Sequence, residues 1–145
     1  MGFWVLSLDI GFSGRTDPDS CMAHIIFYWE AFTVLSILIW VTSDHGCRGT
    51  EVTPFHLTIC SDSTNTVDMF NSLSALPAYN LILMAAVDIM TEFHIDLRVI
   101  HIPGSENSVA DTLSHSQFAL ACSLCPGIRI QKFQPPHLPL GAAEK

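Results

Sequence analysis

The spacing of apolar and polar positions divides the N-terminal part of the chain into a strand, a turn region and a helix. Residues 3–10 alternate roughly between large apolar and small or polar side chains, which predicts a strand that Gly11 closes. Residues 12–22 are rich in turn-forming side chains. The apolar run at 25–43 has the length of a helix, and the turn formers at 44–46 mark its end.

The middle of the chain alternates β-branched runs with helical spacing. The order from residue 25 onward is helix, strand, helix, helix, strand, helix, which favours an α/β domain. Two strands separated by helices pair in parallel in such a domain. The predicted elements after the first helix are a strand at 55–60, a helix around 67–73 that Leu76 and Pro77 break, a helix at 80–93 capped by Asn80, a strand at 97–102, and two helical turns at 108–114.

The regular pattern fades after His115. Pro126, Pro135, Pro136 and Pro139 lie among scattered apolar residues, which is typical of an extended arm. We therefore expect a domain over 1–115 and an extended C-terminal tail or linker over 116–145.

Composition narrows the class of protein. Of the 145 residues 49% are hydrophobic, so the chain has enough apolar material for a packed core, and disorder is excluded. The chain has 6 basic and 14 acidic residues and a formal charge of −8. So few cations cannot cover a phosphate backbone, which argues against strong freestanding binding to nucleic acid.

A mean hydropathy of +0.38 raises the question of a membrane span. The candidate is 25–41, at the lower limit of length for crossing a bilayer. It contains Glu30, and no cluster of Lys or Arg flanks it. We expect a buried helix in which Glu30 faces a polar site, with a small membrane protein as the alternative.

The N-terminus and the cysteines point to a reducing compartment. No basic region precedes the first apolar stretch, and Asp9 interrupts that stretch, so we expect a protein that is cytoplasmic or nuclear and not secreted. The five cysteines are then reduced thiols. Cys122 and Cys125 have the spacing of a zinc knuckle or a redox dithiol. No second pair completes four zinc ligands, so we interpret them as two loop thiols.

Three carboxylates come from separate predicted elements. Asp62 follows the strand at 55–60, Asp111 lies on the helix after the last strand, and Glu30 lies in the long apolar helix. They could converge at the edge of the sheet where α/β folds place their sites, and oxygen ligands suit Mg²⁺ or Mn²⁺. Two such ions could clamp the attacking and leaving oxygens of a phosphodiester. The alternatives are a helix cap for Asp62 and a solvated helix position for Asp111.

Three stretches that contain these residues, IFYWEAFTVLS, LTICSDSTNTVDMFNSL and LRVIHIPGSENSVADTLS, resemble the ribonuclease H domain that follows reverse transcriptase in retroelements. The pattern is most similar to that of fungal elements of the gypsy and DIRS types. The resemblance implies a ribonuclease H-like α/β fold, a mixed sheet flanked by helices. It also implies an endonuclease that cuts the RNA strand of an RNA/DNA hybrid with two Mg²⁺ or Mn²⁺ ions. The partners it implies are the hybrid and an adjoining reverse transcriptase domain, without a small-molecule cofactor.

The resemblance also implies roles for individual residues. His101 matches a loop histidine that assists proton transfer or product release, although a half-exposed strand residue would fit there equally. Helix capping and turn formation are the alternatives for the positions near the hybrid backbone. The implied metal ligands are Glu30, Asp62 and Asp111, and the implied backbone-binding residues are Ser63, Thr64 and Asn107.

The chain departs from the family pattern in two places. His115 stands where the family has Arg, which removes one phosphate contact. The family's first strand, which carries the initial metal-binding Asp, has no counterpart before Gly2, so we expect an N-terminally truncated domain with three of four ligands. Because that strand is central, its neighbours would have open edges. We expect marginal stability and little hydrolytic activity, and the alternative is a non-catalytic interaction domain that uses an exposed edge.

Overall fold

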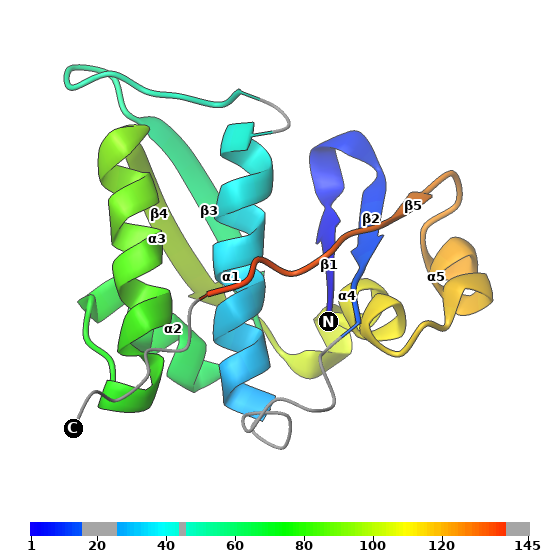
Figure 1. Cartoon of the computed structure of the whole chain (residues 1–145). Helices are drawn as coiled ribbons and strands as arrows, with labels where there is room; N and C mark the ends of the chain where they lie inside the picture. The colour runs from blue at the N-terminus through cyan, green and yellow to red at the C-terminus, as the bar shows by residue number, and fades with distance from the viewer. Residues whose placement is uncertain (16–25, 44–45, 139–145) are drawn as a thin grey trace.

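The structure is a computed structural model that describes residues 1–15, 26–43 and 46–138 (Figure 1). It is a mixed α/β arrangement, as the order of elements predicted. The predicted turn region at 12–22 is wrong at 12–13, which belong to a strand, and its residues 16–22 lie outside the described residues, as do 44–45 of the predicted helix end at 44–46. The described strands and α-helices are β1 (Gly2–Val5), β2 (Ile10–Ser13), α1 (Ile26–Ser43), β3 (Phe55–Ser61), α2 (Thr64–Ser72), α3 (Asn80–Glu92), β4 (Ile95–His101), α4 (Ser108–Ser114), α5 (Phe118–Leu124) and β5 (Arg129–Lys132).

The predicted parallel pair is present. β3 pairs with β4 in parallel over seven residues, from Phe55 opposite Ile95 to Ser61 opposite His101. The ladder continues for one bond, in which the N–H of Ile102 donates to the carbonyl of Ser61 (2.9 Å). Both strands therefore end at the same edge, which confirms the expected pairing between 55–60 and 97–102.

The helices after β3 also match their predicted positions. α2 follows Ser63, whose hydroxyl accepts a hydrogen bond from the N–H of Thr66, as an N-cap residue does. α3 and α4 agree with the predicted ranges to within one residue. The cap prediction for Asn80 is wrong, because Tyr79 occupies the N-cap position of α3 and Asn80 is the first helical residue.

The N-terminal strand prediction is partly wrong. Residues 3–10 do not form one strand but most of a hairpin, in which β1 and β2 pair antiparallel around a 3₁₀ turn at Leu6–Leu8. Asp9 ends that turn in the left-handed conformation (φ 51°). Leu6 and Leu8 are exposed, so the apolar alternation that predicted one strand continues through a surface turn.

The prediction of an extended tail from 116 is wrong for residues 118–132. α5 packs against α4, and β5 pairs with β2 in parallel (Figure 1). Gly127, with a φ of +90°, lies in the turn between α5 and β5. Ala121 and Ile128 are buried against α4, which explains why this segment folds back onto the protein. Residues 133–138 have no regular structure, and 139–145 lie outside the described part.

Helix α1 packs against both sheets, through one core with β3 and β4 and a second core with the β1–β2 hairpin. Its Leu35 and Leu38 have no exposed surface and belong to a core shared with α2, α3, β3 and β4. Trp40 and Val41, at its C-terminal end, pack with Phe3 and Phe12 of the hairpin in a second core. The helix is buried on most faces, as the sequence led us to expect, and it lies in front of the space between β3 and β1 in Figure 1.

The strands form two sheets rather than one. The order is β1-β2-β5 in the first sheet and β3-β4 in the second. β1 therefore has a strand partner on one side, and so does β3. Each presents an open edge within the described part of the chain.

Candidate functional site

The carboxyl ends of β3 and β4 bring two predicted site residues to one edge. Asp62 directly follows Ser61, and Ser61 lies opposite His101 in the ladder. Both Asp62 and His101 are exposed. The edge beyond the carboxyl ends of parallel strands is the usual position of a site in an α/β fold.

Asp62 is not used to cap the following helix. Ser63 occupies the N-cap position of α2, where its hydroxyl accepts bonds from the N–H of Thr66 (3.3 Å) and the hydroxyl of Thr66 (3.0 Å). The capping alternative for Asp62 is therefore wrong, whereas the one for Ser63 is confirmed. Thr64, the first residue of α2, is exposed.

The loop after β4 lies against Asp62. The side-chain amide of Asn107 donates to Asp62 Oδ1 (3.2 Å). A Cβ atom added to Gly104 would lie 3.6 Å from Asp62 Oδ2, so the backbone of this loop passes close to the carboxylate. The segments PGSEN and SDS, 40 positions apart in the sequence, thus meet in one small polar area.

Helix α4 extends this polar area. Asn107 is its N-cap residue, and Asp111 and His115 follow at intervals of four, so the three side chains share one face of the helix. His115 Nδ1 lies 3.4 Å from Asp111 Oδ1, an ion pair when the histidine is protonated. Both side chains are more than 60% exposed, so the pair contributes little to stability.

No hydrogen bond or ion pair joins Glu30 to this group. It lies half-buried near the N-terminal end of α1 and makes no such interaction with the described residues. Within 1–15, 26–43 and 46–138, no three or more His, Cys, Asp or Glu side chains lie close enough together to hold a metal ion. The metal ligands therefore stay a prediction from the resemblance.

Comparisons with known proteins leave the family open. No protein-family model, curated protein or solved structure matches the chain. The mixed α/β class rests on the structure itself.

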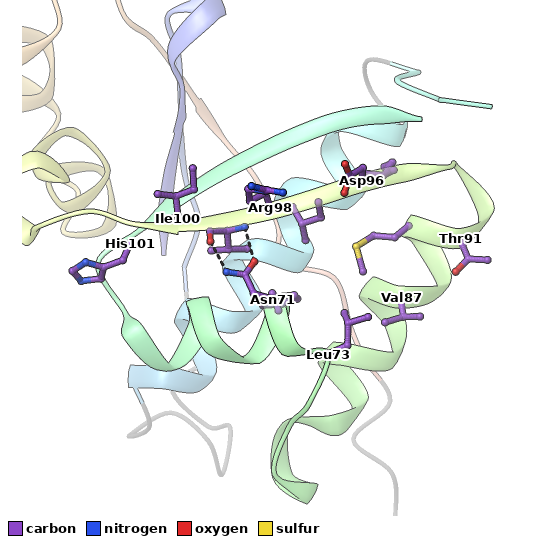
Figure 2. Close-up of a pocket in the computed structure, with 13 residues that line it drawn as sticks. Asn71, Leu73, Val87, Thr91, Asp96, Arg98, Ile100 and His101 are labelled. Carbon is purple, nitrogen blue, oxygen red and sulfur yellow. Dashed lines mark hydrogen bonds between the residues drawn. The ribbon is translucent and has the colours of Figure 1, made fainter. Parts of the chain in front are cut away.

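A groove beside the candidate site was not predicted from the sequence. It has a volume of about 750 Å³ and lies between the end of α2, one side of α3 and the whole of β4 (Figure 2). Asn71 of α2 donates to the carbonyl of Val99 (2.8 Å) and accepts from the N–H of Val99 (3.1 Å). At Val99 of β4, this side-chain amide thus makes the two backbone hydrogen bonds that a neighbouring strand would otherwise make. Asn71 itself is exposed, and the spacing of residues in the sequence does not show this pairing.

His101 connects the groove to the candidate site. It lines one end of the groove and is labelled there in Figure 2, and it is also the β4 residue opposite Ser61. A ligand at the carboxyl edge that extends along β4 would pass this imidazole.

Two segments of the described chain bear on the question of a membrane span. By length and composition, α1 could cross a bilayer, and α2 with Pro77–Glu92 would pass the same test if that pair, bent by 80°, were one span. Of the α1 window, 56% is buried, as in the core helix of a soluble protein. The core helix of a soluble protein passes the same test of length and composition.

Proposed function

We propose that the chain is a ribonuclease H-like domain of retroelement origin that recognises an RNA/DNA hybrid and cuts it poorly or not at all. The proposal joins the resemblance of three sequence stretches to one observation, the contact between Asp62 and Asn107. That contact brings the second and third of these stretches together at the carboxyl edge of β3 and β4.

The placement of the polar side chains supports recognition of a sugar-phosphate backbone. Thr64, His101 and Asn107 supply hydroxyl, imidazole and amide groups beside the exposed Asp62. Such groups bind 2′-hydroxyls and phosphates without reading base edges. The formal charge of −8 predicts weak binding that is detectable only at low salt.

The chemistry of the carboxylates fits Mg²⁺ or Mn²⁺. Asp62 and Asp111 offer oxygen ligands of the type that these ions prefer. Asp111 Oδ1 lies 3.4 Å from His115 Nδ1, and Glu30 makes no hydrogen bond or ion pair with the described residues. Impaired cleavage is the expected property, because the resemblance matches three of the family's four metal ligands.

A cleavage assay tests this function. The chain is incubated with an end-labelled RNA/DNA hybrid and Mg²⁺ or Mn²⁺, beside an Asp62→Asn variant. We expect the two proteins to give the same background. Robust cleavage that Asp62→Asn abolishes would place the catalytic site correctly and contradict the impairment. Cleavage equal in both would point to a contaminating nuclease.

The open edge of β3 favours a second candidate function, a non-catalytic interaction domain that accepts a β-strand. In a parallel ladder alternate residues bond to the partner strand. Phe55 donates to His94 and Ser61 accepts from Ile102, so the odd-numbered residues of β3 face β4. The N–H and C=O groups of His56, Thr58 and Cys60 therefore face the open edge, where a strand could pair with them.

A proline substitution tests this second function. Thr58→Pro removes an N–H from the open edge and leaves the ladder to β4 intact, whereas Ile59→Pro removes a bond to β4. If the edge pairs with another chain, Thr58→Pro reduces association in sedimentation velocity while the circular dichroism spectrum is kept. A chain that is monomeric before substitution, and captures no strand peptide, would contradict this function. Ile59→Pro should unfold the sheet and serves as the contrast.

A further inference from the structure

The motif Cys122-Ser-Leu-Cys125 lies at the C-terminal end of α5, not in a loop. Cys122 is an exposed helical residue, and Cys125 is the half-buried C-cap residue. The Cys125 thiol contacts Asp9 Oδ1 (3.9 Å) at the turn between β1 and β2. The motif thus joins α5 to the N-terminal hairpin.

The helix holds the Cα atoms of the two cysteines near the separation found in disulfides. Residues three apart in an α-helix have Cα atoms about 5 Å apart, within the range of disulfides. Their Cβ atoms are about 5–6 Å apart, farther than the roughly 4 Å of a relaxed disulfide. One cysteine must therefore turn toward the other.

Cys125 is the cysteine that can turn. Its backbone has left the helical conformation (φ −132°, ψ 86°), although its N–H still donates to Ala121 (2.9 Å). Turning the side chain and backbone of Cys125 toward Cys122 would break the contact between its thiol and Asp9. It would also strain the hydrogen bond from its N–H to the Ala121 carbonyl. A disulfide formed here would be strained and exposed, and such disulfides are readily reduced.

We propose that Cys122 and Cys125 form a reversible redox site that exchanges with low-molecular-weight disulfides such as oxidised glutathione. The Cys122 thiolate attacks one sulfur of the small disulfide, and one thiolate leaves. The Cys125 thiolate then attacks the mixed disulfide at Cys122, which forms the Cys122–Cys125 bond and expels the second thiolate. The two departing thiolates take up the protons that the cysteines lost, so one disulfide is reduced as the other forms.

The order of attack follows from the surroundings. Cys122 is exposed and meets the small disulfide first. Partial burial and the nearby Asp9 carboxylate raise the pKa of the Cys125 thiol, so fewer Cys125 thiolates are present at neutral pH. Cys125 is thus the resolving cysteine.

Peptide mass spectrometry tests the proposal on the full chain. Trypsin cleavage after Arg98 and Arg129 gives the peptide 99–129, which contains Cys122 and Cys125 and no other cysteine. After incubation with oxidised glutathione, acid quenching and alkylation with maleimide, we expect this peptide to have lost two hydrogens and to carry neither maleimide nor glutathione. A tenfold excess of reduced glutathione should restore the dithiol.

Two results would overturn the proposal. One is a 99–129 peptide that stays a dithiol, or carries only mixed disulfides, under conditions in which the exposed Cys60 is fully glutathionylated. The other is a Cys122–Cys125 bond that resists the excess of reduced glutathione. The matched variants are Cys60→Ser, which should leave the disulfide unchanged, and Cys125→Ser, which should leave the mixed disulfide on Cys122.

Discussion

Asn107 donates a hydrogen bond from its side-chain amide to Asp62 over 3.2 Å, although 45 positions separate the two residues. The bond joins the loop before α4 to the carboxyl end of β3. Because Asp62 is exposed and does not cap α2, this bond and the passing loop backbone define its surroundings. The candidate site depends on this pair.

Asn107→Asp should destabilise the loop. The substitution places a second carboxylate beside Asp62, so the unfolding free energy should fall by about 1 kcal/mol at neutral pH and low salt. High salt should remove much of the loss, since the Debye length falls to about 3 Å at 1 M. Urea unfolding at the two salt concentrations measures both effects. Ser105→Asp adds the same charge to the same loop without a bond to Asp62, and an equal loss in that control would contradict the contact.

Asn71→Asp should weaken the attachment of α2 to β4. The carboxylate cannot donate to the carbonyl of Val99, and this leaves a half-buried acceptor unpaired. The expected cost is about 1–3 kcal/mol in chemical denaturation. Asn65→Asp, at an exposed position of the same helix, should change stability by less than about 0.5 kcal/mol. Equal effects of the two variants would argue against the paired amide.

Trp40→Ala should release the N-terminal hairpin before the β3–β4 pair. The indole packs edge-on against Phe12 (4.8 Å between ring centroids) and Phe3 (6.3 Å). Truncation of a buried tryptophan costs about 3–5 kcal/mol. Hydrogen exchange should accelerate in β1 and β2 more than in β3 and β4. Val34→Ala, in the other core, should give the opposite order, and a uniform loss in both variants would show that the two halves unfold as one unit.

Asp9→Asn should make Cys125 react faster with iodoacetamide. Partial burial first, and then Asp9, raise the pKa of Cys125 in the folded protein, and the substitution removes the second cause. A raised folded pKa contributes stability that is fully present below the ordinary thiol pKa of 9.0 and is lost as the pH rises through the folded value. Because the pKa of the Cys125 thiol falls in the variant, the rise of its alkylation rate with pH, measured between pH 7 and 10, should occur at a lower pH. An unchanged profile would contradict the contact, and Cys122 serves as the internal control.

The sequence predicted the centre of the fold better than its ends. The β-branched runs at 55–60 and 97–102 each lie next to segments with a clear helical spacing of apolar residues. They predict a parallel pair because the local residue pattern and the geometry of strand pairing favour the same structure. The hairpin and α5 with β5 were missed for a physical reason. Their segments are short, and Phe118, Leu120 and Leu124 stay exposed, so burial leaves no clear period in the sequence.

The candidate site was predictable only in part. The positions of Asp62 and Asp111 after two neighbouring strands follow from topology, because parallel strands end at one edge. The pairing of Asp111 with His115 and the half-buried surroundings of Glu30 depend on side-chain packing, which the spacing of residues in the sequence does not show. Asn107 was expected near nucleic acid, and its bond to Asp62 adds a role that the motif alone does not contain.

The most direct test of the account is a titration of the isotope-labelled chain with a short RNA/DNA hybrid at low salt, followed by amide NMR. The central claim is that Asp62 and the residues around it bind the hybrid. We predict shifts that concentrate at residues 61–64, 101–107 and 111, that weaken as salt is added, and that are smaller with duplex DNA of the same sequence. Shifts confined to other surfaces, or equal shifts with both duplexes, would contradict the assignment of this edge as a hybrid-binding site.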